Sequence, residues 1–141
     1  MGIFGRSKNA APGGGRGTGY VGSFLSPHSP DDTARIVHAG LAGQLSNESA
    51  EVTGPGLLES IYLSRFDSSG ITVVAGNSVD TYFSFAVDLT ATSAGTEGRA
   101  HLDRPARSVK RWMGNTIKIS SGVQIALEGA GVQIVSWDIG F

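Results

Sequence analysis

The segment from Arg104 to Glu128 separates apolar and basic side chains onto opposite sides when it is wound as a helix at about 100° per residue. One arc, with Met113 at its edge, carries Val109, Trp112, Thr116, Ile119, Val123, Ala126 and Leu127. The opposite arc carries Arg104, Arg107, Lys110, Arg111 and Lys118. This separation predicts a long amphipathic helix with one buried face and one basic face.

A second interpretation of the same segment is open. It contains β-branched residues and three small residues that weaken a helix, Gly114, Ser121 and Gly122. Ile117 and Ile125 also fit the apolar arc poorly. If residues 116–128 form strands, the protein is mostly β.

A shorter helix is expected from Pro30 to about Leu45. Ser29 can accept a hydrogen bond from an early backbone N–H, Pro30 suits the first turn, and the aspartates that follow favour the positive end of the helix dipole. Its apolar face contains Ile36, Val37, Gly40 and Leu41. This pattern predicts a half-buried helix.

Between and after these helices, apolar residues recur at every second position, which is typical of half-buried strands. The strongest alternation places Phe83, Phe85, Val87 and Leu89 on one side. The other strands are expected at about 58–66, 71–75, 96–102 and 132–139, with turns rich in glycine, serine and proline between them.

The expected fold is therefore α+β, with an antiparallel sheet of about five strands and two helices packed on one face. A chain of 141 residues with 40% hydrophobic content suffices for one core. Residues 1–26 are expected to be a flexible glycine-rich leader, since ordering so many glycines costs entropy. Residues 27–141 are expected to form the single domain.

Within that leader, Gly17-Thr18-Gly19-Tyr20-Val21-Gly22 fits the pattern G-x-G-x-x-G. It resembles the phosphate-binding fingerprint of nucleotide-sugar dehydrogenases, in which the glycines follow a buried strand and open a helix. Here no apolar strand precedes the motif, and Pro27 and Pro30 interrupt any helix after it. We therefore do not infer nucleotide binding.

The charge and the composition limit the partners, the cellular location and the cofactors that we expect. The net charge is −1, so no overall field attracts the protein to nucleic acid or an anionic membrane, and nucleic acid is not an expected partner. Cysteine is absent and no apolar run is long enough to cross a bilayer, which favours a cytoplasmic location. No motif calls for a metal or another cofactor. The 21 glycines and the excess of arginine over lysine are typical of GC-rich bacterial genomes.

Two candidate binding surfaces follow from the long helix. The five cations Arg104, Arg107, Lys110, Arg111 and Lys118 form a basic stripe suited to an anionic partner. On the apolar side, Trp112 and Met113 would face Phe83 and Phe85 of the strongest strand. These four residues define a candidate pocket for an apolar ligand, and the alternative is that they simply pack in the core.

The one candidate catalytic group is His101. In an extended strand at 96–102 it shares a face with Glu97 and Arg99, and Asp103 lies just beyond. Such a row can supply an acid, a base and an anion clamp, and it is also what a solvated ladder of ion pairs looks like.

The sequence therefore favours a non-catalytic binding module that engages a protein or an apolar or anionic ligand. One alternative is a structural subunit of a larger assembly, including a homo-oligomer. The other is a small enzyme that uses His101 with Glu97 or Asp103.

Overall fold

The computed structural model of the protein describes residues 18–46, 52, 54, 59–103 and 109–138, and for Thr18 and residues 109–112 it describes the backbone only. The elements follow one another as β1 (Thr18–Ser26), α1 (Pro30–Leu41), the 3₁₀ turn η1 (Ala42–Gln44), β2 (Ser60–Asp67), β3 (Gly70–Gly76), β4 (Thr81–Thr92), β5 (Gly95–Asp103), α2 (Val109–Gly129) and β6 (Gln133–Trp137).

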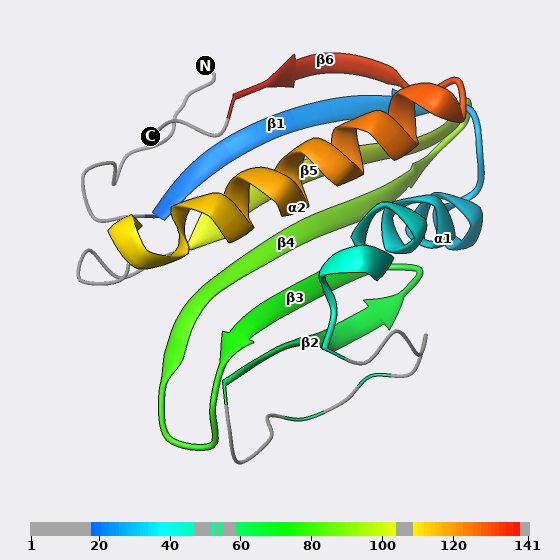
Figure 1. Cartoon of the computed structure of the whole chain (residues 1–141). Helices are drawn as coiled ribbons and strands as arrows, with labels where there is room; N and C mark the ends of the chain where they lie inside the picture. Colours follow the sequence, from blue (N-terminus) through cyan, green and yellow to red (C-terminus); the bar gives the residue numbers. More distant parts are fainter. Residues whose placement is uncertain (1–17, 47–51, 53, 55–58, 104–108, 139–141) are drawn as a thin grey trace.

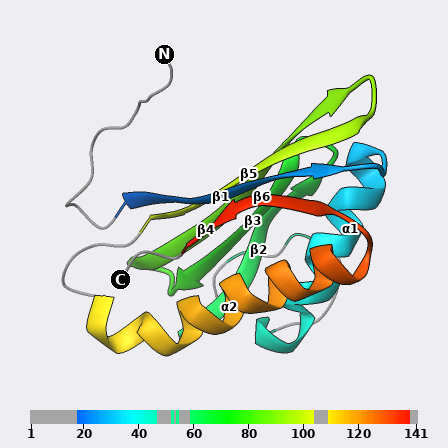
Figure 2. The ribbon, with the colours of Figure 1, turned by 90° about the horizontal axis from the view of Figure 1, so that it is seen from above.

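The expected α+β architecture is confirmed. The strands form one sheet in the order β2-β3-β4-β5-β1-β6, and every neighbouring pair is antiparallel. Among the described residues the sheet has six strands, where the sequence indicated about five. Both helices lie on one side of the curved sheet, and α2 runs along it (Figures 1 and 2). We call this side the inner face and the opposite side the outer face.

The additional strand corrects the predicted leader. Thr18–Ser26 belongs to the sheet as β1, between β5 and β6, so the ordered domain begins before residue 27. One of the glycines that suggested flexibility, Gly22, is needed there for close packing. A Cβ added at Gly22 would collide with the backbone oxygen of Ser136 in β6. The remainder of the predicted leader, residues 1–17, lies outside the described residues.

Helix α1 begins as expected and ends earlier than expected. The Ser29 side chain accepts a hydrogen bond from the backbone N–H of Asp32 at 3.1 Å, and Pro30 occupies the first turn. The helix ends at Leu41 instead of Leu45, and the chain continues as the 3₁₀ turn η1, which contains Gly43. Glycine weakens helices because it loses more backbone entropy than any other residue.

The long helix is confirmed, and the strand interpretation of residues 116–128 is wrong, because these residues lie within α2. The buried stripe has the predicted phase: it contains Thr116, Ile119, Ser120, Val123 and Leu127. Ile117 and Ile125 are 42% and 69% exposed, which explains why they fitted the apolar arc poorly. The helix ends at Gly129, and Gly131 follows it with a φ of +80° that favours glycine.

The two helices approach closely because each presents a glycine to the other. A Cβ added at Gly40 of α1 would lie 2.5 Å from the backbone oxygen of Gly122 in α2. A Cβ added at Gly122 would meet the backbone oxygen of Gly40 in turn. This contact fixes the second half of α2 against α1.

Candidate functional site

The inner face of the sheet is lined by large apolar side chains that have no access to solvent. Phe83 and Phe85 of the candidate pocket are both 0% exposed, as is Phe24 of β1. Met113, on the first half of α2, is half-buried. The side chain of Trp112 lies outside the described residues. The structure therefore places all four predicted pocket residues on β4 and α2, describes the side chains of three of them, and leaves the pocket a prediction.

Two hydroxyl groups interrupt the apolar stripe of α2. Thr116 is 1% exposed and Ser120 is 4% exposed. The Thr116 hydroxyl donates to the backbone oxygen of Met113 at 2.8 Å, and Ser120 Oγ accepts a hydrogen bond from Trp137 Nε1 of β6 at 2.9 Å. Sequence reasoning placed Thr116 on the buried arc and missed Ser120, although a serine one turn after Thr116 shares that arc.

The structure describes one side chain of the basic stripe. Lys118 is exposed on α2, as predicted. Arg104 and Arg107 lie outside the described residues, and so do the side chains of Lys110 and Arg111. The proposed anionic-partner surface therefore stays a prediction.

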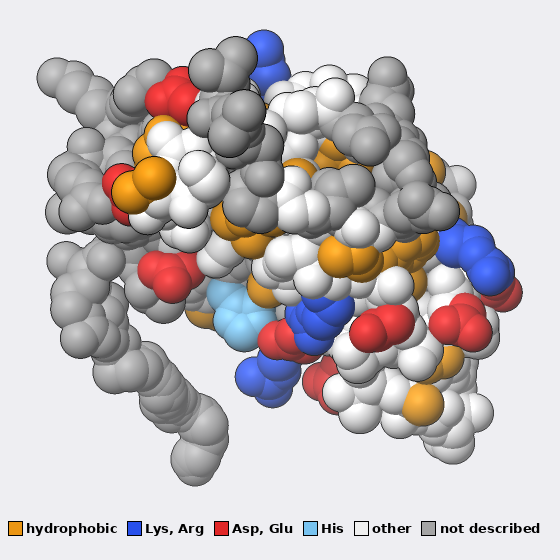
Figure 3. All heavy atoms as spheres, turned by 90° about the horizontal axis from the view of Figure 1, so that it is seen from below, with side chains coloured by type: hydrophobic (Ala, Val, Ile, Leu, Met, Phe, Trp, Pro, Cys, Tyr) orange, Lys and Arg blue, Asp and Glu red, His pale blue; other side chains and the backbone are white. Residues whose placement is uncertain are grey.

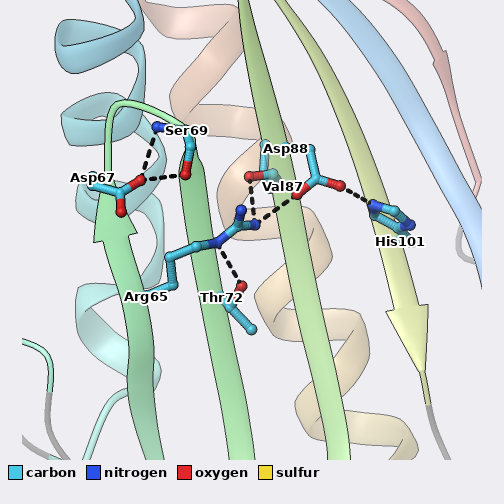
Figure 4. A network of polar contacts seen from close by, with 7 residues as sticks. All are labelled: Arg65, Asp67, Ser69, Thr72, Val87, Asp88 and His101. Carbon is cyan, nitrogen blue, oxygen red and sulfur yellow. Dashed lines mark hydrogen bonds and ion pairs between the residues drawn. The ribbon is translucent and has the colours of Figure 1, made fainter.

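A row of polar side chains crosses four strands on the outer face (Figure 4). Arg65 Nη2 of β2 lies 2.7 Å from Asp88 Oδ1 of β4, and Arg65 Nε donates to Thr72 Oγ1 of β3 at 3.0 Å. His101 Nε2 of β5 lies 2.6 Å from the other oxygen of Asp88. Figure 3 shows the β2 side of the sheet from below. A histidine lies there among acidic and basic side chains.

His101 is thus engaged by a residue that the sequence did not connect with it. Arg99, His101 and Asp103 are exposed on one side of β5 as predicted, and Glu97 is half-buried. The hydrogen-bond partner of His101 is Asp88. In the pairing of β4 with β5, Ala86 lies opposite His101 and Asp88 lies opposite Arg99, so Asp88 is a diagonal neighbour of His101. This pairing register could not be obtained from the sequence of one strand.

The ionisation of Asp88 is set by opposing effects. Partial burial raises the pKa of its carboxyl, but hydrogen bonds from Arg65 and His101 outweigh this effect and leave the pKa below its ordinary value. A carboxyl whose pKa is lowered by folding stabilises the folded protein above its unfolded pKa. That contribution is lost as the pH falls through the folded pKa.

We therefore expect Asp88→Asn to lower the urea midpoint at pH 7 and to have a smaller effect at pH 3. The difference between the two proteins should shrink below about pH 4, near the ordinary pKa of an aspartate. Urea unfolding of both proteins across this range checks it, with Glu97→Gln on the neighbouring strand as the control. An unchanged difference between pH 7 and pH 3 would show that the ionised carboxylate contributes nothing.

The other two histidines have structural surroundings. His28 Nε2 lies 2.7 Å from the backbone oxygen of Ala130, just after α2, so this nitrogen carries the proton and donates. The His38 ring stacks on Phe66 with the ring centres 5.0 Å apart. Among the described residues, histidines and carboxylates nowhere gather in a group of three that could hold a metal ion. Neither helix in the described part of the chain combines the length and apolar content needed to span a bilayer.

No protein-family model matches the sequence, and a search of curated proteins finds no match either. Solved structures resemble the fold. One is the crystal structure of protein MLL2253 from Mesorhizobium loti, which is 13% identical, with a TM-score of 0.50 over 79% of this chain and 97% of that one. Ara h 8.0201 covers the same shares at 14% identity and a TM-score of 0.41, which is too low to support a conclusion. The likeness to the Mesorhizobium loti protein is a likeness of fold.

Proposed function

We propose that the protein is a non-catalytic module that binds an apolar small molecule between α2 and the inner face of the sheet. The observation that carries this proposal is the long helix laid along an inner face on which Phe24, Phe83 and Phe85 are 0% exposed. A long helix laid along a curved antiparallel sheet resembles the Bet v1-like fold, whose members typically hold hydrophobic ligands in a cavity, and this likeness favours the same class of ligand here.

The packing of α2 indicates which part of the helix would admit the ligand. In the second half, Val123 and Leu127 are 0% exposed and Gly122 contacts Gly40 of α1. In the first half, Met113 is only half-buried. Methionine adapts its shape easily, and it is common at surfaces that accommodate varied apolar partners. We therefore place the ligand next to Met113, with Phe83 and Phe85 as the floor of its site.

We expect the protein to bind the fluorescent apolar probe 1-N-phenylnaphthylamine with a Kd of roughly 1–10 μM, which corresponds to burial of most of a small ligand's surface. Met113→Trp should weaken this binding about tenfold or more, because the larger side chain would occupy the proposed site. Fluorescence titration of both proteins measures the effect.

The matched control is Ser121→Trp, which adds the same side chain at an exposed position of the same helix. It should leave the affinity for the probe unchanged. The proposal fails if the wild-type protein does not bind the probe, or if the two tryptophan variants weaken binding equally.

A further inference from the structure

We propose that the ligand carries one neutral hydroxyl group, and that Ser120 and Thr116 bind it together. This inference rests on the proposed function and specifies the chemical class of its ligand: an apolar alcohol. It is based on the hydrogen bonds that the two hydroxyl groups on the buried stripe of α2 make, and on those that they can still make.

Among the described residues, the buried hydroxyl of Ser120 has no acceptor for its proton. A serine hydroxyl can donate one hydrogen bond and accept others. In the described part of the chain, Ser120 makes one side-chain hydrogen bond, in which its oxygen accepts the Trp137 indole proton at 2.9 Å. Because the residue is 4% exposed, water has little access to the unused proton. A ligand that supplies an acceptor there recovers the cost of burying an unpaired donor.

Thr116 offers the complementary group. Its proton is committed to the backbone oxygen of Met113 at 2.8 Å, so toward a ligand its oxygen can only accept. Thr116 and Ser120 are separated by one helical turn on the same buried stripe, a spacing of about 5–6 Å between Cβ atoms. A ligand oxygen between them can lie at hydrogen-bond distance, about 2.8 Å, from each.

This pair of groups selects a hydroxyl over other oxygen groups. A hydroxyl accepts from Ser120 and donates to Thr116, whereas an ether or a ketone can only accept. An ionised carboxylate would direct its negative oxygens at the lone pairs of Thr116. The described residues of the buried stripe provide no cation to offset its charge, and Lys118 is exposed.

The test compares two isomers of equal size, 1-decanol and methyl nonyl ether, as competitors that displace 1-N-phenylnaphthylamine from the full-length protein. The wild-type protein should prefer 1-decanol by roughly fivefold, the value of one additional hydrogen bond. Decanoate should compete more weakly than 1-decanol. Thr116→Val, which keeps the shape of the side chain, should abolish the preference for 1-decanol without abolishing probe binding.

A second variant and a control complete the design. Ser120→Ala should weaken both isomers, and its thermal midpoint reports whether loss of the acceptor for Trp137 has also disturbed the fold. Ser121→Ala, at the adjacent exposed position, should retain the wild-type preference. Equal binding of the two isomers by the wild-type protein, or an unchanged preference in Thr116→Val, would overturn the inference while leaving the proposed apolar site intact. Failure of the wild-type protein to bind any of the probes would overturn both.

Discussion

Replacing Gly40 with alanine is expected to lower the free energy of unfolding by roughly 2–3 kcal/mol, a typical cost of forcing extra volume into a packed contact. The added Cβ would lie 2.5 Å from the backbone oxygen of Gly122 and 2.9 Å from its carbonyl carbon. Neither atom belongs to a side chain that can rotate away, so α1 and α2 must separate. Chemical denaturation of the purified variant measures the loss.

The control for this experiment is Gly114→Ala. Gly114 lies in α2, is exposed, and has nothing within 4 Å of the position that a Cβ would occupy. Alanine there should raise the free energy of unfolding by up to about 1 kcal/mol, because it forms helices better than glycine. If Gly40→Ala were neutral or stabilising, the two helices could not cross as closely as described.

Replacing Gly98 with alanine is expected to cost about 3 kcal/mol, at the upper end of overpacking effects. Gly98 of β5 lies directly opposite Phe24 of β1, and a Cβ at this position would overlap the Phe24 ring, which is 0% exposed. The clash should be partly relieved by Phe24→Leu, since a smaller side chain leaves room for the new methyl group.

A double-mutant cycle separates this contact from general damage to the core. Phe24→Leu alone should destabilise the protein by about 1–2 kcal/mol, and the double variant should be more stable than the sum of the two single effects predicts. Strictly additive effects would mean that the phenylalanine ring does not lie over the glycine.

These two glycines also indicate where sequence reasoning reached its limit. The alternation over β5 placed Gly98 on the apolar side, and the helical pattern placed Gly40 on the buried face of α1. Neither pattern could show what each glycine contacts. The contact partners, Phe24 and Gly122, come from segments distant in sequence, and their pairing depends on the register of the sheet and the crossing of the helices.

The long helix was predictable because its signal is local. A repeat of about 3.6 residues, sustained over more than five turns, determined both the element and its buried side. Strand β1 was missed for the opposite reason, since its glycines weaken the alternation by which a strand is recognised. In the candidate site, Phe83, Phe85 and Met113 followed from periodicity. The pairing of Ser120 with Trp137 and of His101 with Asp88 required tertiary structure.

The position of β1 also constrains how the protein can be made. Thr18–Ser26 leaves the ribosome before the other described strands, yet both of its neighbours in the sheet, β5 and β6, are synthesised much later. During translation β1 therefore has no strand to pair with until Gly95–Asp103 emerges, and it lacks its second neighbour until Gln133–Trp137 is complete. The exposed edges of such an unfinished sheet favour aggregation, so we expect rapid pairing of β1 with β6 to protect the newly made chain.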